Sequence, residues 1–127
     1  MTKGIGIDMA DVRELKRLCT DVGEAFVRRT FTEAERREAL AAPDFHEYLA
    51  GRFAVKEAVF KALAHLTPEK TFDFRRVETL KREDGSPCVT ITPFLAEIME
   101  KAGADRLLVS ITTQDPFAVA FVLAEGE

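Results

Sequence analysis

Residues Arg52 to Leu63 read as a helix that is apolar almost all the way round, yet the segment carries Glu57 and Lys61 one turn apart. At about 100° per residue, this pair shares its side of the helix with small and aromatic residues: Ala50, Phe53, Ala54, Phe60 and Ala64. We expect this face to pack against another part of the molecule. Because burying bare charge is costly, the carboxylate and the ammonium need partners, and a metal ion and a phosphate would serve. A simpler interpretation is an exposed pair four residues apart, which stabilises a helix by roughly 0.3–0.5 kcal/mol.

Composition limits the classes of function. The 127 residues, 46% of them hydrophobic, predict a single domain spanning residues 1–127 around one core. A net charge of −4 and a pI near 5.3 argue against general nucleic-acid binding. The longest strongly apolar run, Phe117 to Ala124, is too short to span a membrane, and the N-terminus lacks the apolar stretch of a signal peptide. Cys19 and Cys88 have no CxxC spacing and the two histidines lie far apart, so we expect reduced thiols in a cytoplasmic protein without a zinc site.

Hydrophobic spacing predicts an α+β fold, with helices mostly in the first half and an antiparallel sheet mostly in the second. The first strand, residues 3–8, places Ile5 and Ile7 on one face and glycines on the other, where another backbone or a ligand can approach closely. The capping box Thr32-Glu33-Ala34-Glu35 opens a helix to about Ala41. The remaining expected helices span 9–19, 24–29, 44–66 and 93–102, and the remaining strands span 74–80, 88–92, 107–113 and 117–123.

Asp8 stands where the first predicted strand gives way to a helix. One interpretation is a helix N-cap, a position that Asp fills well. The preceding Gly4-Ile5-Gly6 does not complete a dinucleotide-binding fingerprint, because Met9 occupies the place of its third glycine. The sequence therefore gives no support for a dinucleotide-binding fold.

Taken together, Gly4-Ile5-Gly6-Ile7-Asp8 and the segment FAVKEAVFKAL at residues 53–63 resemble two paired signatures of the phosphopantetheinyl transferases of the short holo-acyl-carrier-protein synthase type. These signatures are Gly-x-Asp near the N-terminus and (Trp/Phe)-x-x-Lys-Glu-x-x-x-Lys on a long helix. Five further stretches are similar to that family, in the same order: residues 31–35, 47–53, 84–87, 109–111 and 117–120. The resemblance covers nearly the whole chain and implies the family's fold, an antiparallel sheet packed against a long central helix.

The resemblance also implies a reaction, in which the 4′-phosphopantetheine arm of coenzyme A moves to a serine of an apo acyl carrier protein and 3′,5′-ADP is released. The carrier could belong to fatty acid biosynthesis or to a polyketide or peptide pathway, and the sequence does not choose between them. Asp8, Glu57 and Lys61 would be the catalytic residues. Asp8 and Glu57 would hold Mg²⁺, a cation often bound by one or two carboxylates plus substrate phosphates. Lys61 would contact the same coenzyme A phosphates. Arg52 and Lys56 lie on other sides of the helix and would bind coenzyme A only if the site lies between subunits, as the family's homotrimer allows; solvated or structural charge is the alternative.

Carrier proteins present an acidic helix, so the enzyme needs a basic docking surface. Arg13, Lys16 and Arg17 share one side of the first helix and satisfy that need. Arg28 and Arg29 would extend this surface, with Phe26 or Phe53 as its apolar contact, although a simple solvated face would show the same spacing.

Two positions depart from the family pattern. Glu14 stands where the family often has Arg, and Thr113 stands where many members have a His near the coenzyme. A hydroxyl can hydrogen-bond a phosphate, but it supplies neither a cationic contact nor a base near pH 7. This leaves a second hypothesis, a non-catalytic descendant that binds coenzyme A or a carrier protein. A third is an unrelated α+β protein with a surface Glu–Lys pair.

Overall fold

The computed structural model describes residues 1–68 and 72–127. The elements follow in the order β1 (Thr2–Asp11), α1 (Val12–Asp21), α2 (Glu24–Thr30), α3 (Glu33–Ala41), α4 (Phe45–Leu63), β2 (Glu78–Lys81), β3 (Pro87–Thr90), α5 (Pro93–Ala102), β4 (Arg106–Gln114) and β5 (Phe117–Glu125). Two short 3-10 turns, Ala64–Leu66 and Phe74–Arg76, lie between α4 and β2. The predicted α+β class is confirmed.

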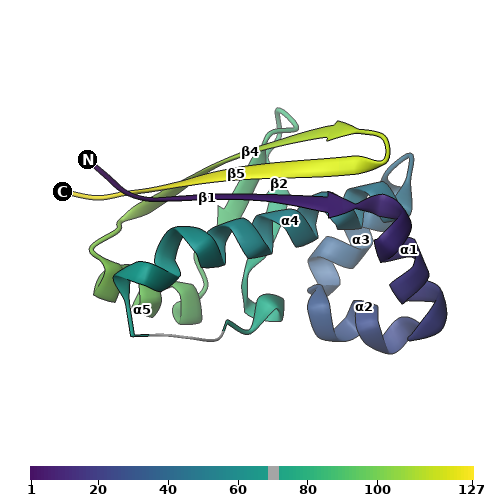
Figure 1. Cartoon of the computed structure of the whole chain (residues 1–127), viewed down its shortest axis with the longest axis horizontal. Coiled ribbons are helices and arrows are strands. Elements are labelled where there is room, and N and C mark those ends of the chain that lie inside the picture. The colour runs from purple at the N-terminus through teal and green to yellow at the C-terminus, as the bar shows by residue number, and fades with distance from the viewer. Residues whose placement is uncertain (69–71) are drawn as a thin grey trace.

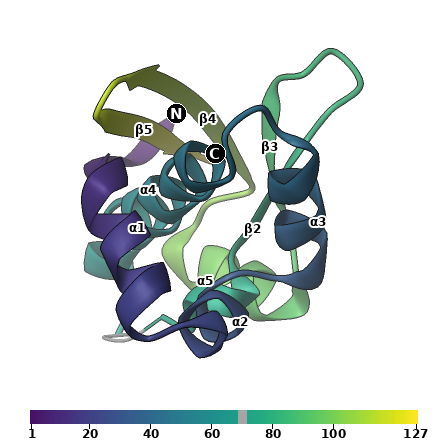
Figure 2. The same cartoon turned by 90° about the vertical axis from the view of Figure 1, so that its right-hand side faces the viewer.

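Two antiparallel sheets flank the long helix α4. In the larger sheet, β5 lies between β1 and β4, and Phe121 pairs with Ile7 on one side and Ser110 on the other. The smaller sheet pairs β2 with β3. Helix α4 runs along the larger sheet, helices α1–α3 gather at one end, and both chain termini lie at the opposite end (Figures 1 and 2). The predicted packing of an antiparallel sheet on a long central helix is therefore correct.

Two glycines of β1 allow α4 to lie directly against the strand. A Cβ atom on Gly4 would stand 2.0 Å from the carbonyl oxygen of Ala62, and one on Gly6 would stand 1.8 Å from that of Ala58. These are backbone atoms, so a flexible side chain cannot move aside to make room. The close approach expected at the glycine face of the first strand is thus an approach of the α4 backbone.

Helix α4 forms the centre of the hydrophobic core because nearly every side of it is covered. Asp44 caps its start by accepting a hydrogen bond from the backbone N–H of Glu47 at 3.0 Å. Alanine and valine along its length are fully buried, and small side chains permit the short distance to the strands. No helix in the described part of the chain is long and apolar enough to cross a membrane.

Several element boundaries differ from those expected, and two of the differences change how residues are interpreted. Strand β1 continues through Asp11, because Met9, Ala10 and Asp11 keep pairing with β5, and α1 begins only at Val12. The N-cap is Asp11, which accepts a hydrogen bond from the backbone N–H of Arg13; Asp8 lies within the strand and the N-cap interpretation of it is wrong. Residues Phe74–Arg76, predicted as strand, form a 3-10 turn capped by Asp73.

Candidate active site between β1 and α4

Asp8 and Lys61 meet across the contact between β1 and α4. The Lys61 ammonium donates to the Asp8 carboxylate at 3.0 Å and to the backbone carbonyl of Ile7 at 3.1 Å. The Asp8 side chain is 20% exposed and that of Lys61 is 50% exposed, so the pair can be reached from solvent. Lys61 forms no ion pair with Glu57, and the simple pairing of these two residues along the helix does not occur.

Glu57 is the unpartnered carboxylate of this cluster. It is partly buried, and within the described residues it has no hydrogen-bond or ion-pair partner. Burial raises the pKa of the Glu57 carboxyl, the nearby charge of Asp8 raises it further, and Lys61 opposes both effects. Glu57 lies one turn before Lys61 on α4, and Lys61 pairs with Asp8, so the two carboxylates belong to the same region of the contact between β1 and α4.

This donor set fits a magnesium ion. No group of three or more His, Cys, Asp or Glu residues that could hold a metal occurs within residues 1–68 and 72–127. A closed zinc-type site is therefore not present in that part of the chain, whereas Mg²⁺ is commonly bound by one or two carboxylates, waters and substrate phosphates. A cation between Asp8 and Glu57 would also offset their mutual repulsion.

Lys56, the neighbour of Glu57, is fully buried and structural. Its ammonium donates to the Glu35 carboxylate at 2.8 Å, to the Phe74 carbonyl at 2.8 Å and to the Val77 carbonyl. Three bonds use the three donors of an ammonium, so none is left for a phosphate. The expectation that Lys56 binds coenzyme A is wrong in this structure, and the alternative of a structural charge is correct.

Glu35 joins three elements through its buried carboxylate. Besides Lys56, it accepts from the backbone N–H of Thr79 in β2 and from that of Thr32, which completes the predicted capping box of α3. Its capping role was readable from sequence, but its pairing with a lysine 21 residues away was not.

Replacing Lys56 with methionine should destabilise the protein strongly. The Glu35 carboxylate would remain buried without its cation, a loss that costs about 3–5 kcal/mol. Urea denaturation measures the free energy of unfolding. The control, Glu33→Gln, removes an exposed pair with Arg37, which solvent screens, and should change the free energy of unfolding much less than Lys56→Met does. Equal losses in the two variants would contradict the structural role of Lys56.

Arg52 and Thr113 line one cavity of about 300 Å³ on another side of α4. The Arg52 guanidinium lies 4.0 Å from the centre of the Tyr48 ring and 3.7 Å from the Glu38 carboxylate. Its side chain is only 9% exposed, and its buried Nε has no hydrogen-bond partner. Lys81 also lines this cavity and was not anticipated from sequence. None of Asp8, Glu57 and Lys61 lines it, so the predicted site residues form two separate groups in one chain.

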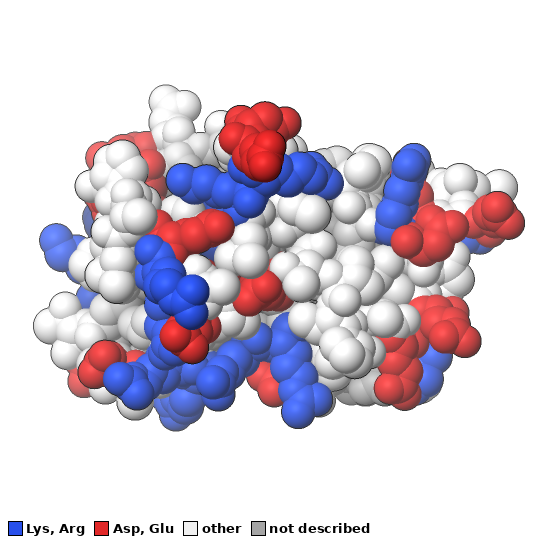
Figure 3. All heavy atoms as spheres, turned by 180° about the vertical axis from the view of Figure 1, so that it is seen from behind, with Lys and Arg blue, Asp and Glu red and all other residues white. Residues whose placement is uncertain are grey.

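The basic residues of α1 are mostly engaged within the chain. The Arg13 guanidinium makes a bidentate ion pair with the carboxylate of the capping Asp11 at 2.8–3.0 Å. The Arg17 guanidinium lies 3.1 Å from the Glu14 carboxylate. The Asp11 pKa is lowered to about 2, chiefly by its hydrogen bond with Arg13. The Lys16 ammonium has no hydrogen bond or ion pair among the described residues, although the Lys16 carbonyl accepts from the Thr20 hydroxyl, so this ammonium is the most available cation of the helix. Figure 3 shows further Lys and Arg side chains interleaved with Asp and Glu at the end that carries α1–α3.

Comparison with known proteins decides the family. A family model described as the 4′-phosphopantetheinyl transferase superfamily matches residues 4–122. The chain belongs to this superfamily. A holo-[acyl-carrier-protein] synthase from Thermodesulfovibrio yellowstonii is 35% identical over 123 residues, which cover 97% of this chain and 98% of the relative.

Solved members of the superfamily share the fold over the full length. The crystal structure of holo-[acyl-carrier-protein] synthase from Neisseria meningitidis has a TM-score of 0.88 and 32% identity, covering 98% of this chain and 99% of that chain. A holo-(acyl-carrier-protein) synthase from Bacillus anthracis, solved in complex with CoA (3′,5′-ADP), has a TM-score of 0.78 and 29% identity, covering 100% of this chain and 99% of that chain. The suspected family resemblance is thereby confirmed.

Proposed function

We propose that this chain is a holo-[acyl-carrier-protein] synthase, which transfers 4′-phosphopantetheine from coenzyme A to a serine hydroxyl of an apo acyl carrier protein. The observation that carries the proposal is the ion pair of Asp8 with Lys61 across β1 and α4, with the unpartnered Glu57 one turn before Lys61. It occurs in a chain whose full-length relatives carry that name. The coenzyme A complex of the Bacillus anthracis relative supports coenzyme A as the substrate.

In the proposed reaction, the serine oxygen forms a bond to the β-phosphorus of coenzyme A. The bond from this phosphorus to the bridging oxygen breaks, and 3′,5′-ADP leaves. Lys61 places its ammonium beside Asp8, where it can contact the pyrophosphate and stabilise the charge that grows on the leaving group. Asp8 and Glu57 would hold Mg²⁺, which when bound neutralises charge on the pyrophosphate.

Arg52 and Thr113 are proposed to bind another part of coenzyme A. Their cavity is lined by the Arg52 side chain, whose guanidinium is 3.7 Å from Glu38, and by the exposed Thr113, and a guanidinium and a hydroxyl are both suited to an anionic phosphate. Because this cavity is separate from the Asp8–Glu57–Lys61 cluster, one coenzyme A molecule would use the cluster of one subunit and the cavity of the next. This arrangement requires the site to lie between subunits.

The outer face of the larger sheet is proposed as the subunit interface. On β1 and β5 its exposed side chains are mostly apolar, and β4 adds Leu108 among polar residues such as Ser110 and Thr112. The exposed apolar residues are Ile5, Ile7, Met9, Leu108, Phe117 and Phe121. Contiguous apolar surface of this kind marks an association site. A homotrimer built through this face would bring the two groups of site residues together.

Replacing Ile7 with aspartate should dissociate the proposed trimer. Ile7 is 56% exposed and pairs with Phe121, so the substitution places a charge in the middle of the apolar face without disturbing the monomer core. Light scattering after size exclusion should change from trimer to monomer, and transferase activity should fall with it. Val22→Asp, at an apolar residue that is 46% exposed and follows the last residue of α1, should leave the trimer intact. A wild-type monomer would contradict the proposal.

An apolar groove beside the catalytic cluster is proposed to receive the carrier protein. Met9, Leu15, Leu18 and Phe53 line it, together with the acidic Asp11 and Glu14. Lys16 lies on α1, the helix that supplies Leu15 and Leu18. An acidic carrier helix would place its charge against Lys16 and its apolar side chains in the groove.

A second candidate function, binding without transfer, is favoured by Thr113 alone. Two measurements on the same sample distinguish this non-catalytic binder from the proposed transferase. Chromatography should detect 3′,5′-ADP only when coenzyme A, Mg²⁺ and an apo carrier are all present. Calorimetric binding of coenzyme A or carrier with no release of 3′,5′-ADP would instead identify a non-catalytic binder.

A further inference from the structure

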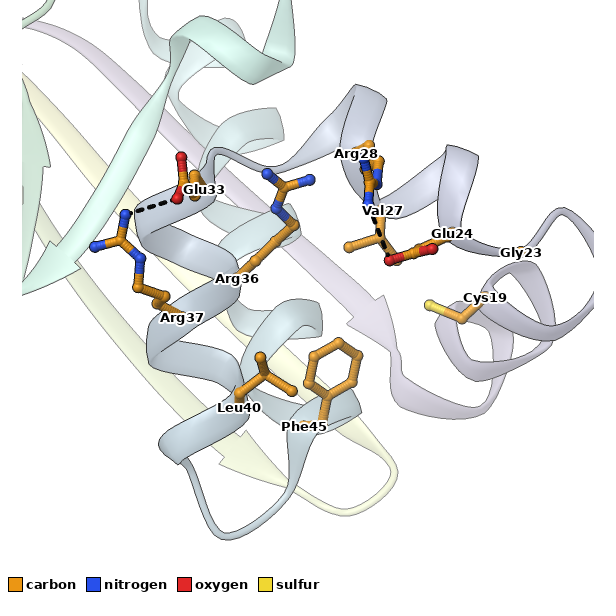
Figure 4. A pocket seen from close by; sticks show the side chains of 10 residues that line it. All are labelled: Cys19, Gly23, Glu24, Val27, Arg28, Glu33, Arg36, Arg37, Leu40 and Phe45. Carbon is orange, nitrogen blue, oxygen red and sulfur yellow. Dashed lines mark hydrogen bonds and ion pairs between the residues drawn. The ribbon is translucent and has the colours of Figure 1, made fainter.

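A groove of about 440 Å³ lies between the α1–α2 pair and α3. Of the residues that line it, only Arg28 was assigned above to contacts with a metal, a substrate or another subunit. Its lining contains Cys19 of α1, Val27 of α2, Leu40 of α3 and Phe45 at the start of α4. Figure 4 shows these side chains lying around one hollow, with Leu40 and Phe45 facing Cys19 across it. Its volume lies within the range of about 300–1,000 Å³ that is typical of small-molecule pockets.

The rim of the groove has three arginines but only two glutamates to pair with them. Arg28 donates to Glu24 at 3.3 Å and Arg37 donates to Glu33 at 2.9 Å. The guanidinium of Arg36 has no hydrogen bond or ion pair within residues 1–68 and 72–127. In Figure 4 its side chain extends from α3 toward α2, above the apolar part of the hollow.

Arg36 would bind the anionic head of a ligand, and the apolar walls indicate that the remainder of that ligand is apolar. Leu40 is 76% exposed although it lies beside Phe45 (Figure 4) and lines the same groove as Val27, so a chain laid in the groove would remove apolar surface from water. A free inorganic anion would satisfy Arg36 but leave these walls uncovered. A planar carboxylate matches the guanidinium fork.

We propose that this groove is a second ligand site, which binds a small amphiphilic carboxylate with its head on Arg36 and its apolar body against Val27, Leu40 and Phe45. Arg36 follows Glu35, the carboxylate that anchors Lys56 beside Glu57. An occupied groove would therefore lie against the end of the scaffold that holds the catalytic helix.

Octanoate is the probe for this site. Its binding to the full-length protein is measured by ¹H–¹⁵N NMR. We expect saturable shifts confined to the groove, at Val27 and Leu40 among others, with a dissociation constant on the order of 1 mM or lower. Arg36→Gln should weaken octanoate binding by about tenfold, as loss of a charge-assisted contact does, and should leave 1-octanol binding unchanged. Leu40→Asn should weaken both.

Arg75→Gln, at an exposed arginine outside the groove, is the matched control and should change neither ligand. Absence of saturable shifts, shifts on the outer sheet face at Ile7 and Phe121, or equal losses in Arg36→Gln and Arg75→Gln would overturn the proposal. Thermal melts of each variant verify that it is folded. Octanoate binding requires neither coenzyme A nor a carrier protein, so its outcome is distinct from that of the transferase assay.

Discussion

Replacing Glu57 with glutamine is expected to lower the rate of phosphopantetheine transfer by roughly 100-fold or more, the cost commonly seen when one electrostatic contact to developing charge is removed. Glutamine keeps the size of the side chain but removes the negative charge that would hold Mg²⁺ opposite Asp8. Because Glu57 makes no hydrogen bond or ion pair with described residues, the substitution breaks nothing in the fold. Initial rates of carrier modification at saturating coenzyme A measure the effect.

Two controls separate a metal role from a structural one. Glu100→Gln, at an exposed carboxylate on α5, should keep the wild-type rate. Asp8→Asn should lose activity as Glu57→Gln does, and excess Mg²⁺ should restore part of the rate in either variant if each contributes one ligand. Wild-type transfer by Glu57→Gln would exclude Glu57 from the reaction.

Replacing Gly6 with alanine is expected to be the most destabilising single-methyl change in β1. The new Cβ would lie 1.8 Å from the carbonyl oxygen of Ala58 and 2.7 Å from its carbonyl carbon, so the backbone of α4 would have to move. Overpacking of this kind costs about 1–3 kcal/mol and occasionally more, and we expect the upper end because the clash involves backbone. Urea denaturation of the purified variant measures the loss.

Gly51 supplies the matched control on α4. Its added Cβ would meet only the Ile111 side chain at 3.4 Å, an ordinary contact, and alanine favours a helix over glycine by about 1 kcal/mol. Gly51→Ala should therefore unfold at the same or a higher urea concentration than the wild type. A Gly6→Ala protein as stable as Gly51→Ala would show that β1 and α4 are not in direct backbone contact.

Local sequence patterns predicted much of the fold. The glycines of β1 predicted a close approach, and the capping box, the cap before α4 and Pro93 with Gly103 marked helix ends that the structure contains. Asp11 was missed as an N-cap because strand pairing with Phe117, more than 100 residues away, decides where β1 ends. Pairing of that kind leaves no local signal in the sequence.

The same distinction between local patterns and distant contacts applies to the candidate site. Asp8, Glu57 and Lys61 were grouped from their motifs; the structure pairs Asp8 with Lys61, Glu57 lies one turn before Lys61 on α4, and the catalytic roles of all three stay predictions. Lys56 was misassigned because its partner Glu35 is brought beside it only when α3 packs on α4. In sequence, a lysine beside a catalytic glutamate looks the same whether it faces a phosphate or a buried carboxylate.

The intact mass of an apo acyl carrier protein, recorded before and after incubation with this chain, coenzyme A and Mg²⁺, tests the central claim most directly. The account predicts the gain of one phosphopantetheine per carrier, lost when the acceptor serine is replaced by alanine and lost when Mg²⁺ is chelated. An unchanged mass with several apo carriers and a folded enzyme, or a full gain with Glu57→Gln, would contradict it.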